Sequence, residues 1–193
     1  MKKFRVGFAI VMAALVILLI TWVSCLSSGA KKYWFTVGEG NFQWLGISAV
    51  VAVLTLIINF IVKWYDNKIK KIEQVQMMVA EYLTKITSSL TDTYNRAIEP
   101  NSIDALNRSN DSNMKVNLLY NEISFQVKNI PNGKEVGNEV DKTQSRYLKN
   151  NGEIRSFMNG GITDNKKAMK FKEIMNEEYG EIDKTIKKIS SLM

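Results

Sequence analysis

The chain has 193 residues, with 26 Lys or Arg against 19 Asp or Glu, no histidine and one cysteine. Because histidine is absent and Cys25 is alone, Ser-His and Cys-His nucleophile pairs, the usual zinc sites and an intrachain disulfide are excluded. No G-x-x-x-x-G-K-S/T or G-x-G-x-x-G motif occurs either, so we expect no phosphate-cradling loop, no enzymatic activity, no metal and no cofactor.

Two long uncharged stretches near the start of the chain predict a transmembrane helical hairpin over residues 1–64. No residue between Arg5 and Lys31 is charged, and none between Glu39 and Lys63 is charged. Each stretch exceeds the ~20 apolar residues that span a bilayer. The two predicted spans are about 6–27 and 42–64.

The distribution of basic residues predicts the orientation of this hairpin. Only Lys31 and Lys32 lie in the loop between the two spans. Basic residues near span ends are retained on the cytoplasmic side, so both termini are expected in the cytoplasm. The basic residues near the other span ends are Lys2, Lys3, Arg5, Lys63, Lys68, Lys70 and Lys71.

A cleaved signal peptide is the alternative interpretation of the first span. A basic start, an apolar run and the pair Ser24-Cys25 are typical of a lipoprotein cleavage site. However, Trp22 stands where such sites normally carry an aliphatic residue, and the apolar run is long for a signal. The sequence therefore favours a retained span.

Charge in the rest of the chain is nearly balanced. Residues 1–64 hold six basic residues and one acid, whereas residues 65–193 hold twenty basic residues and eighteen acids. Most of the positive excess therefore belongs to the predicted membrane anchor, and we expect no bulk nucleic-acid binding.

Polar residues recur along one face of the second predicted span. Ser48, Ala52, Thr55, Asn59 and Val62 are separated by three or four positions, so they share one stripe of a helix. Polar groups at that depth either hydrogen-bond to neighbouring helices or face water in a pore. In the pore interpretation the lining residues are Ser48, Ala52, Thr55 and Asn59. Candidates for an apolar constriction that closes by dewetting are Val51, Leu54, Ile58 and Val62.

Residues 65–99 carry a heptad pattern that predicts a cytoplasmic helical stalk. No Gly or Pro lies between Gly46 and Pro100, so the second span and this segment can form one helix of about fifty residues. The seam is either a coiled-coil contact between copies, with polar Gln76 setting the register, or one face of an intramolecular bundle. Its residues are Ile69, Ile72, Gln76, Val79, Leu83, Ile86 and Leu90.

The remainder of the chain is predicted to be helical, which makes the expected fold class all-α. Asn, Ser and Asp dominate residues 100–113, so this segment is predicted to be a polar linker. A C-terminal helical region then covers 114–193, with its first two helices expected over 114–129 and 134–149. Between them, Pro131-Asn132-Gly133 predicts a turn, since Pro fixes its own φ and Gly permits a positive φ.

A loop and a long final helix complete the predicted C-terminal region. Residues 150–163 contain three glycines and are predicted to form a deformable loop. Asp164 is the predicted N-cap of the last helix. The predicted apolar seam of this helix is Ala168, Phe171, Met175, Tyr179, Ile182, Ile186, Ile189 and Met193.

This layout resembles the membrane effectors of bacterial anti-phage systems, including those of the Hailong, retron and CBASS types. The resemblance covers the whole chain: two spans near the N-terminus, a short outer loop and a helical cytoplasmic part of modest size. It implies an oligomer that sits closed in the bacterial inner membrane. When released by a cytoplasmic regulatory protein or by a nucleotide or oligonucleotide signal, such an oligomer lets ions through and arrests the infected cell.

Two classes of function are therefore expected from the sequence. The first is a homo-oligomeric membrane channel whose soluble helices control a pore lined by the second span. The second is a membrane-anchored coiled-coil scaffold or sensor that recruits a protein partner, with the hairpin serving only as an anchor. A holin-like lysis protein is a third class, and the long structured cytoplasmic part counts against it.

Overall fold

The computed structural model describes residues 36–37, 41–42, 44–159 and 163–193, and it describes side chains from residue 52 onward within those ranges. Apart from one pair of two-residue strands and the short connections between helices, the described residues are helical, so the predicted all-α fold class is confirmed for them. The elements are β1 (Thr36–Val37), β2 (Asn41–Phe42), α3 (Trp44–Ile98), α4 (Ile103–Gln126), η1 (Val127–Asn129), α5 (Gly133–Ser156), η2 (Phe157–Asn159) and α6 (Asp164–Leu192).

The chain divides into two compact units, residues 1–66 and residues 67–193, and α3 contributes to both. In the first unit the described residues are the two strands and the start of α3. The strands pair antiparallel, with Thr36 opposite Phe42. The first predicted span, 6–27, lies outside the described residues. Across the described part of the chain, no helix contains a stretch that is long and apolar enough to cross a membrane.

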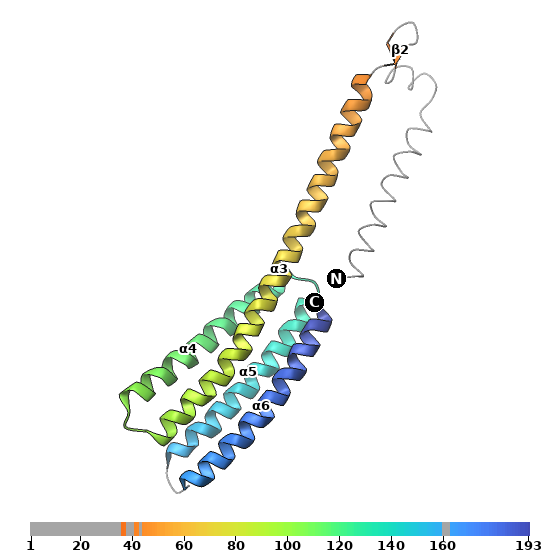
Figure 1. Ribbon diagram of the computed structural model, residues 1–193. Helices are drawn as coiled ribbons and strands as arrows, with labels where there is room; N and C mark the ends of the chain where they lie inside the picture. The colour runs from red at the N-terminus through yellow and green to blue at the C-terminus, as the bar shows by residue number, and fades with distance from the viewer. Residues whose placement is uncertain (1–35, 38–40, 43, 160–162) are drawn as a thin grey trace. The chain divides into compact units, whose positions relative to one another are not determined.

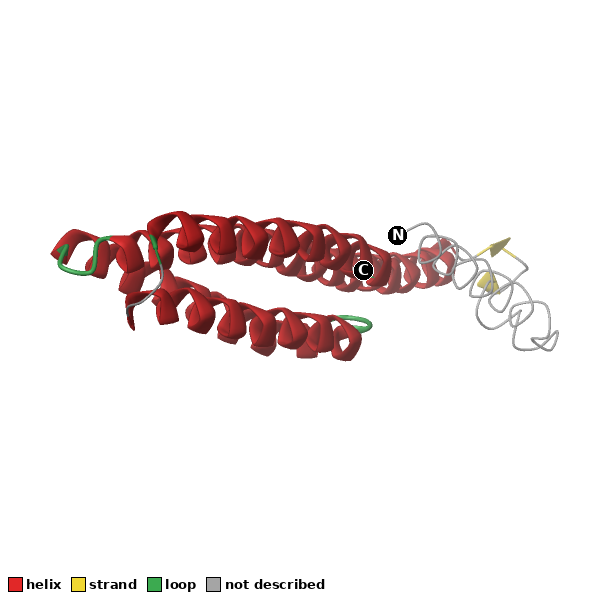
Figure 2. Cartoon of the chain, turned by 90° about the horizontal axis from the view of Figure 1, so that it is seen from below, coloured by secondary structure: helices red, strands yellow, loops and turns green. Residues whose placement is uncertain are grey.

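The second unit is a bundle of four helices in which successive helices run antiparallel. It contains α3 from Asn67 onward together with α4, α5 and α6, which lie alongside one another in both views (Figure 1 and Figure 2). All four contribute to one hydrophobic core, from Val75 on α3 to Ile189 on α6. At the start of α6, the ring of Phe171 stacks on Tyr94 of α3, with centroids 4.1 Å apart.

The beginning of α4 replaces the linker that was predicted at 100–113. After α3 ends, Ser102 caps the next helix by accepting a hydrogen bond from the Ala105 backbone N–H at 3.2 Å. Ser112 and Asn113 are buried, and their side chains donate to backbone carbonyl groups one turn earlier in the same helix. These short polar side chains are therefore satisfied within the helix, which removes the need for a loop.

The turn between α4 and α5 is confirmed, but its two central residues have different roles from those expected. Asn132, and not Gly133, adopts the left-handed conformation, with φ of 53°. Gly133 is required by close approach instead, because a Cβ there would lie 1.7 Å from the carbonyl oxygen of Val127. The turn is also tied to the end of α6, where the Asn132 side chain donates to the Leu192 carbonyl at 2.7 Å.

Most of the loop predicted at 150–163 is helical. α5 continues to Ser156 and η2 follows, while residues 160–162 lie outside the described part. Asn150, Asn151 and Ile154 fall at helical spacing on the face of α5 that packs into the core. Burial of this face explains why the helix continues past the glycine that suggested a loop.

The last helix begins at Asp164, and Thr163 is its N-cap residue in place of the predicted Asp164. The buried face of α6 is also displaced from the predicted seam. Met175 and Ile189 are buried, whereas Tyr179 is 57 % exposed and Ile186 is 45 % exposed. The adjacent residues Glu178 and Thr185 are buried instead. The Glu178 carboxylate faces inward because it pairs with Arg146 of α5.

Candidate functional site

The predicted pore-lining stripe lies on α3, and its described members are open to the surroundings. Ala52, Thr55 and Asn59 are exposed in the single chain, while the side chain of Ser48 lies outside the described residues. Of the predicted constriction, Leu54 is half-buried, and Val51 also lies outside the described side chains. Ile58 and Val62 are 37 % and 41 % exposed. The helical spacing of the stripe is therefore present, and contacts with another copy stay a prediction.

The predicted oligomerisation seam is used largely inside the chain itself. Val79, Leu83, Ile86 and Leu90 are at most 4 % exposed and belong to the core of the four-helix bundle. Ile69, Ile72 and Gln76 are half-buried at the start of this seam. The interpretation as a stalk between copies is therefore wrong for residues 79–90, because their side chains already pack against helices of the same chain.

A buried polar network, which the sequence did not reveal, joins three helices in the middle of the core. The Tyr147 hydroxyl of α5 lies 2.9 Å from Ser89 Oγ of α3 and donates to Asn113 Oδ1 of α4. Asn151 Nδ2 donates to the same Asn113 oxygen at 2.6 Å. Burial raises the pKa of the Tyr147 phenol, so it remains a neutral hydrogen-bond donor.

One acceptor of this network has no partner within the described part of the chain. Asn151 is 6 % exposed, and its Oδ1 atom makes no hydrogen bond there. A second set of polar contacts lies one layer away, where the fully buried Tyr82 hydroxyl donates to Gln144 Oε1 at 2.8 Å. Gln144 in turn donates to Asn117 Oδ1 at 3.0 Å, which links α3, α5 and α4 again. The hydrophobic core of the bundle therefore contains two sets of polar contacts, each of which links α3, α4 and α5.

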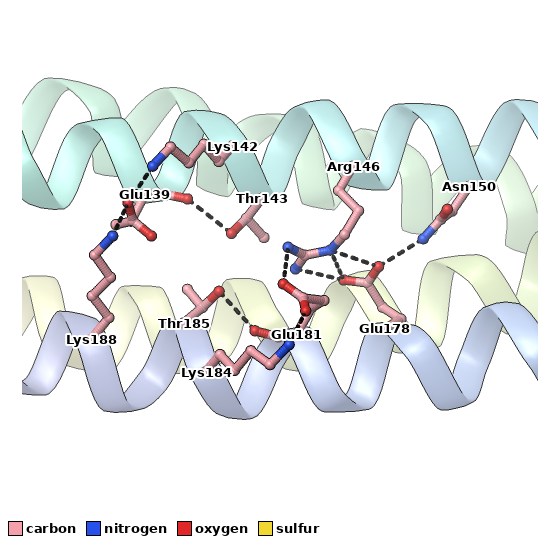
Figure 3. A network of polar contacts seen from close by, with 10 residues as sticks. All are labelled: Glu139, Lys142, Thr143, Arg146, Asn150, Glu178, Glu181, Lys184, Thr185 and Lys188. Atoms are coloured by element: carbon pink, nitrogen blue, oxygen red, sulfur yellow. Dashed lines mark hydrogen bonds and ion pairs between the residues drawn. The ribbon is translucent and has the colours of Figure 1, made fainter.

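A buried ion pair connects α5 to α6 (Figure 3). Glu178 is 0 % exposed, and the Arg146 guanidinium donates to both of its carboxylate oxygens at 3.0 to 3.2 Å. Asn150 Nδ2 adds a third donor at 2.8 Å. Bidentate geometry and an extra donor compensate the carboxylate for the loss of water.

A second ionic contact fastens the same two helices nearer the end of α6. Glu139 accepts hydrogen bonds from Lys142 at 2.8 Å and from Lys188 at 2.7 Å (Figure 3). The Lys142 and Lys188 ammonium groups hold the pKa of the Glu139 carboxyl below its ordinary value. Together with the buried pair, this contact makes the α5–α6 seam the most highly charged contact between described helices.

A crevice of about 600 Å³ opens between the end of α4 and the start of α5. It is referred to below as the α4–α5 crevice. Its polar lining is Tyr120, Ser124, Lys128, Lys134, Asn138 and Asp141. The Tyr120 hydroxyl donates to Asp141 Oδ1 at 2.9 Å across it.

The described residues contain no group of three or more Asp, Glu or Cys side chains placed to hold a metal ion. Comparison of the chain with protein-family models, with curated proteins and with solved structures found no match. The functional interpretation therefore rests on the chain's own chemistry.

Proposed function

We propose that the chain is a homo-oligomeric channel of the bacterial inner membrane, anchored by its hairpin and controlled by its cytoplasmic bundle. The observation that carries this proposal is the continuity of α3, which runs as one helix from Trp44 to Ile98. The same helix therefore contains the uncharged stretch that ends before Lys63 and the core residues that begin at Val75. Repacking of the bundle around α3 has a direct mechanical route into the predicted pore helix.

Exposed apolar side chains on the first part of α3 support a membrane environment for it. Leu56 is 69 % exposed and Phe60 is 73 % exposed, and Val53 and Ile57 are also exposed. Such a continuous apolar surface is rare on a protein in water and indicates contact with lipid or with other helices. Trp64 follows directly, at the position where aromatic rings settle at the membrane interface.

In this proposal, copies of the chain associate through the hairpin and not through the bundle. A two-helix hairpin cannot enclose a path alone, and the core seam of α3 is already occupied by the other bundle helices. Copies that meet through residues 42–64 would place Thr55 and Asn59 around an axis, with Ile58 and Val62 as the constriction. Depolarisation of the membrane in anti-phage defence follows from the layout resemblance.

A membrane-anchored scaffold or sensor is the second candidate, and one observation favours it. On α4 the side chains of Ile103, Met114, Leu118 and Phe125 are each more than half exposed. They are separated by 11, 4 and 7 positions, so they share one stripe of the helix. A cytoplasmic protein partner could contact this stripe without any pore.

Conductance in a planar bilayer tests the channel proposal. The purified chain is expected to give stepwise currents, and Asn59→Leu is expected to change the single-channel conductance because it removes a polar group from the pore wall. Asn67→Leu is the matched control, since Asn67 is exposed on the same helix beyond the uncharged stretch. An assembled protein that passes no current, or equal effects of the two variants, favours the scaffold.

A further inference from the structure

We propose that the α4–α5 crevice binds a small phosphate-bearing molecule with a planar ring, about the size of a mononucleotide. Its volume of about 600 Å³ falls within the ~300–1,000 Å³ that is usual for small-molecule sites. All of its walls belong to the four-helix bundle. The site therefore does not depend on the channel proposal, and either one can fail alone.

The missing side chain of Gly137 keeps the crevice open. Gly137 lies inside α5 and lines the crevice, and glycine within a helix is less favourable than alanine. A Cβ at this position would meet only Val127 Cγ2, at an ordinary contact distance of 3.6 Å. Packing therefore does not require glycine here, in contrast to Gly133, where a Cβ would overlap the backbone.

The charges at the crevice favour an anion. Lys128 comes from η1 and Lys134 from the first turn of α5, so two lysines from neighbouring elements line the crevice. Neither ammonium has an ion-pair partner among the described residues. The single carboxylate in the lining, Asp141, already accepts the Tyr120 hydroxyl hydrogen bond. The crevice thus carries one net positive charge and two uncommitted donors suited to phosphate oxygens.

The remaining lining fits a planar ring with polar edges. The half-buried Tyr120 presents an aromatic ring, and Val127 and Ile130 supply a buried apolar base. Ser124 and Asn138 provide a hydroxyl and an amide that can both donate and accept hydrogen bonds. An aromatic surface beside paired cations is the chemistry that recognises a nucleobase joined to a phosphate.

Two contacts connect the residues around this site to the last helix, α6. The turn that follows Lys128 contains Asn132, whose side chain holds the Leu192 carbonyl at the end of α6. On the opposite side of α5, Glu139 holds Lys188 of α6. A molecule bound between α4 and α5 therefore acts on the α4–α5 turn and on the first two turns of α5, which together carry these two contacts with α6.

Isothermal titration calorimetry on the full chain in detergent tests this proposal, with AMP, GMP, CMP, UMP and inorganic phosphate as the probes. At least one mononucleotide is expected to bind at submillimolar concentration and more tightly than inorganic phosphate. Gly137→Leu is expected to abolish binding by filling the crevice. Gly152→Leu is the matched control on the same helix, because nothing lies within 4 Å of a Cβ at Gly152.

A second variant guards against misfolding as the reason for lost binding. Lys128→Gln combined with Lys134→Gln changes only exposed side chains, so the fold should persist, and affinity is expected to fall by about tenfold or more. Three results would each overturn the proposal: no binding of any mononucleotide at 5 mM, binding that survives Gly137→Leu, or phosphate binding as tight as that of every nucleotide.

Discussion

Arg146→Leu should destabilise the bundle strongly, because it leaves a carboxylate buried without its counter-charge. Glu178 is 0 % exposed and would keep only the Asn150 donor at 2.8 Å. Removing one partner of a buried ion pair typically costs ~3–5 kcal/mol. The side chain of Arg146 is itself only 20 % exposed, so solvent screening reduces this cost little.

The double variant Arg146→Leu with Glu178→Leu separates loss of a charge pair from loss of packing. Replacing both charges removes the desolvation penalty along with the attraction, so its stability should return to within ~1 kcal/mol of the parent chain or exceed it. The exposed pair Lys187–Asp183 is the matched control, since Lys187→Leu should cost less than ~1 kcal/mol.

Urea unfolding followed by far-ultraviolet circular dichroism measures these differences in the full chain in detergent. The reasoning would be refuted if Arg146→Leu cost no more than Lys187→Leu, which would mean that water reaches Glu178. It would also be refuted if the double variant were as unstable as the single one, because packing and not charge would then be the cause.

Four further outcomes follow from the bundle. Glu139 has a lowered folded-state pKa, so its contribution to stability is present above the ordinary value of 4.5 and is lost as the pH falls through the lowered value. Glu139→Gln should therefore make the urea midpoint depend less on pH between pH 6 and pH 3. Tyr147→Phe should cost ~1–3 kcal/mol in urea unfolding, because it removes the partner of the buried Ser89 Oγ and one of the two donors to Asn113 Oδ1, and an unchanged midpoint would contradict the network. Gly180→Ala should raise stability by ~1 kcal/mol, since nothing lies within 4 Å of a Cβ there. Gly133→Ala should lower stability by more than ~1 kcal/mol, because its Cβ would lie 1.7 Å from a carbonyl oxygen; thermal melts of these two variants should therefore move in opposite directions.

Local patterns in the sequence were sufficient to predict the long helices. The absence of Gly and Pro between Gly46 and Pro100 predicted an unbroken helix, and α3 covers Trp44–Ile98. The start of α6 was also predicted to within one residue, from Asp164 and the apolar repeat that follows it. These features depend on neighbours within a few turns, which a single sequence displays.

Features that depend on distant partners were not predictable in the same way. Residues 103–113 look like a linker by composition, yet they are helical, and their buried face meets other helices: Ser109 contacts Thr93 of α3, and Asn113 accepts hydrogen bonds from α5. Tyr147 meets an α3 residue 58 positions away, and no local pattern indicates that pairing. The heptad seam of α3 correctly marked a packing face, but the sequence could not decide whether its partner was another copy or the same chain.

Cysteine cross-linking in native membranes tests the central claim most directly, namely that copies meet through the polar stripe of the second span. In a Cys25→Ser background, Asn59→Cys is compared with Ile57→Cys, which lies about 160° away around the same helix. The channel proposal expects oxidation to give covalent dimers from Asn59→Cys and few from Ile57→Cys. Monomers from both variants, or dimers from Ile57→Cys alone, would contradict an assembly with Asn59 at its axis.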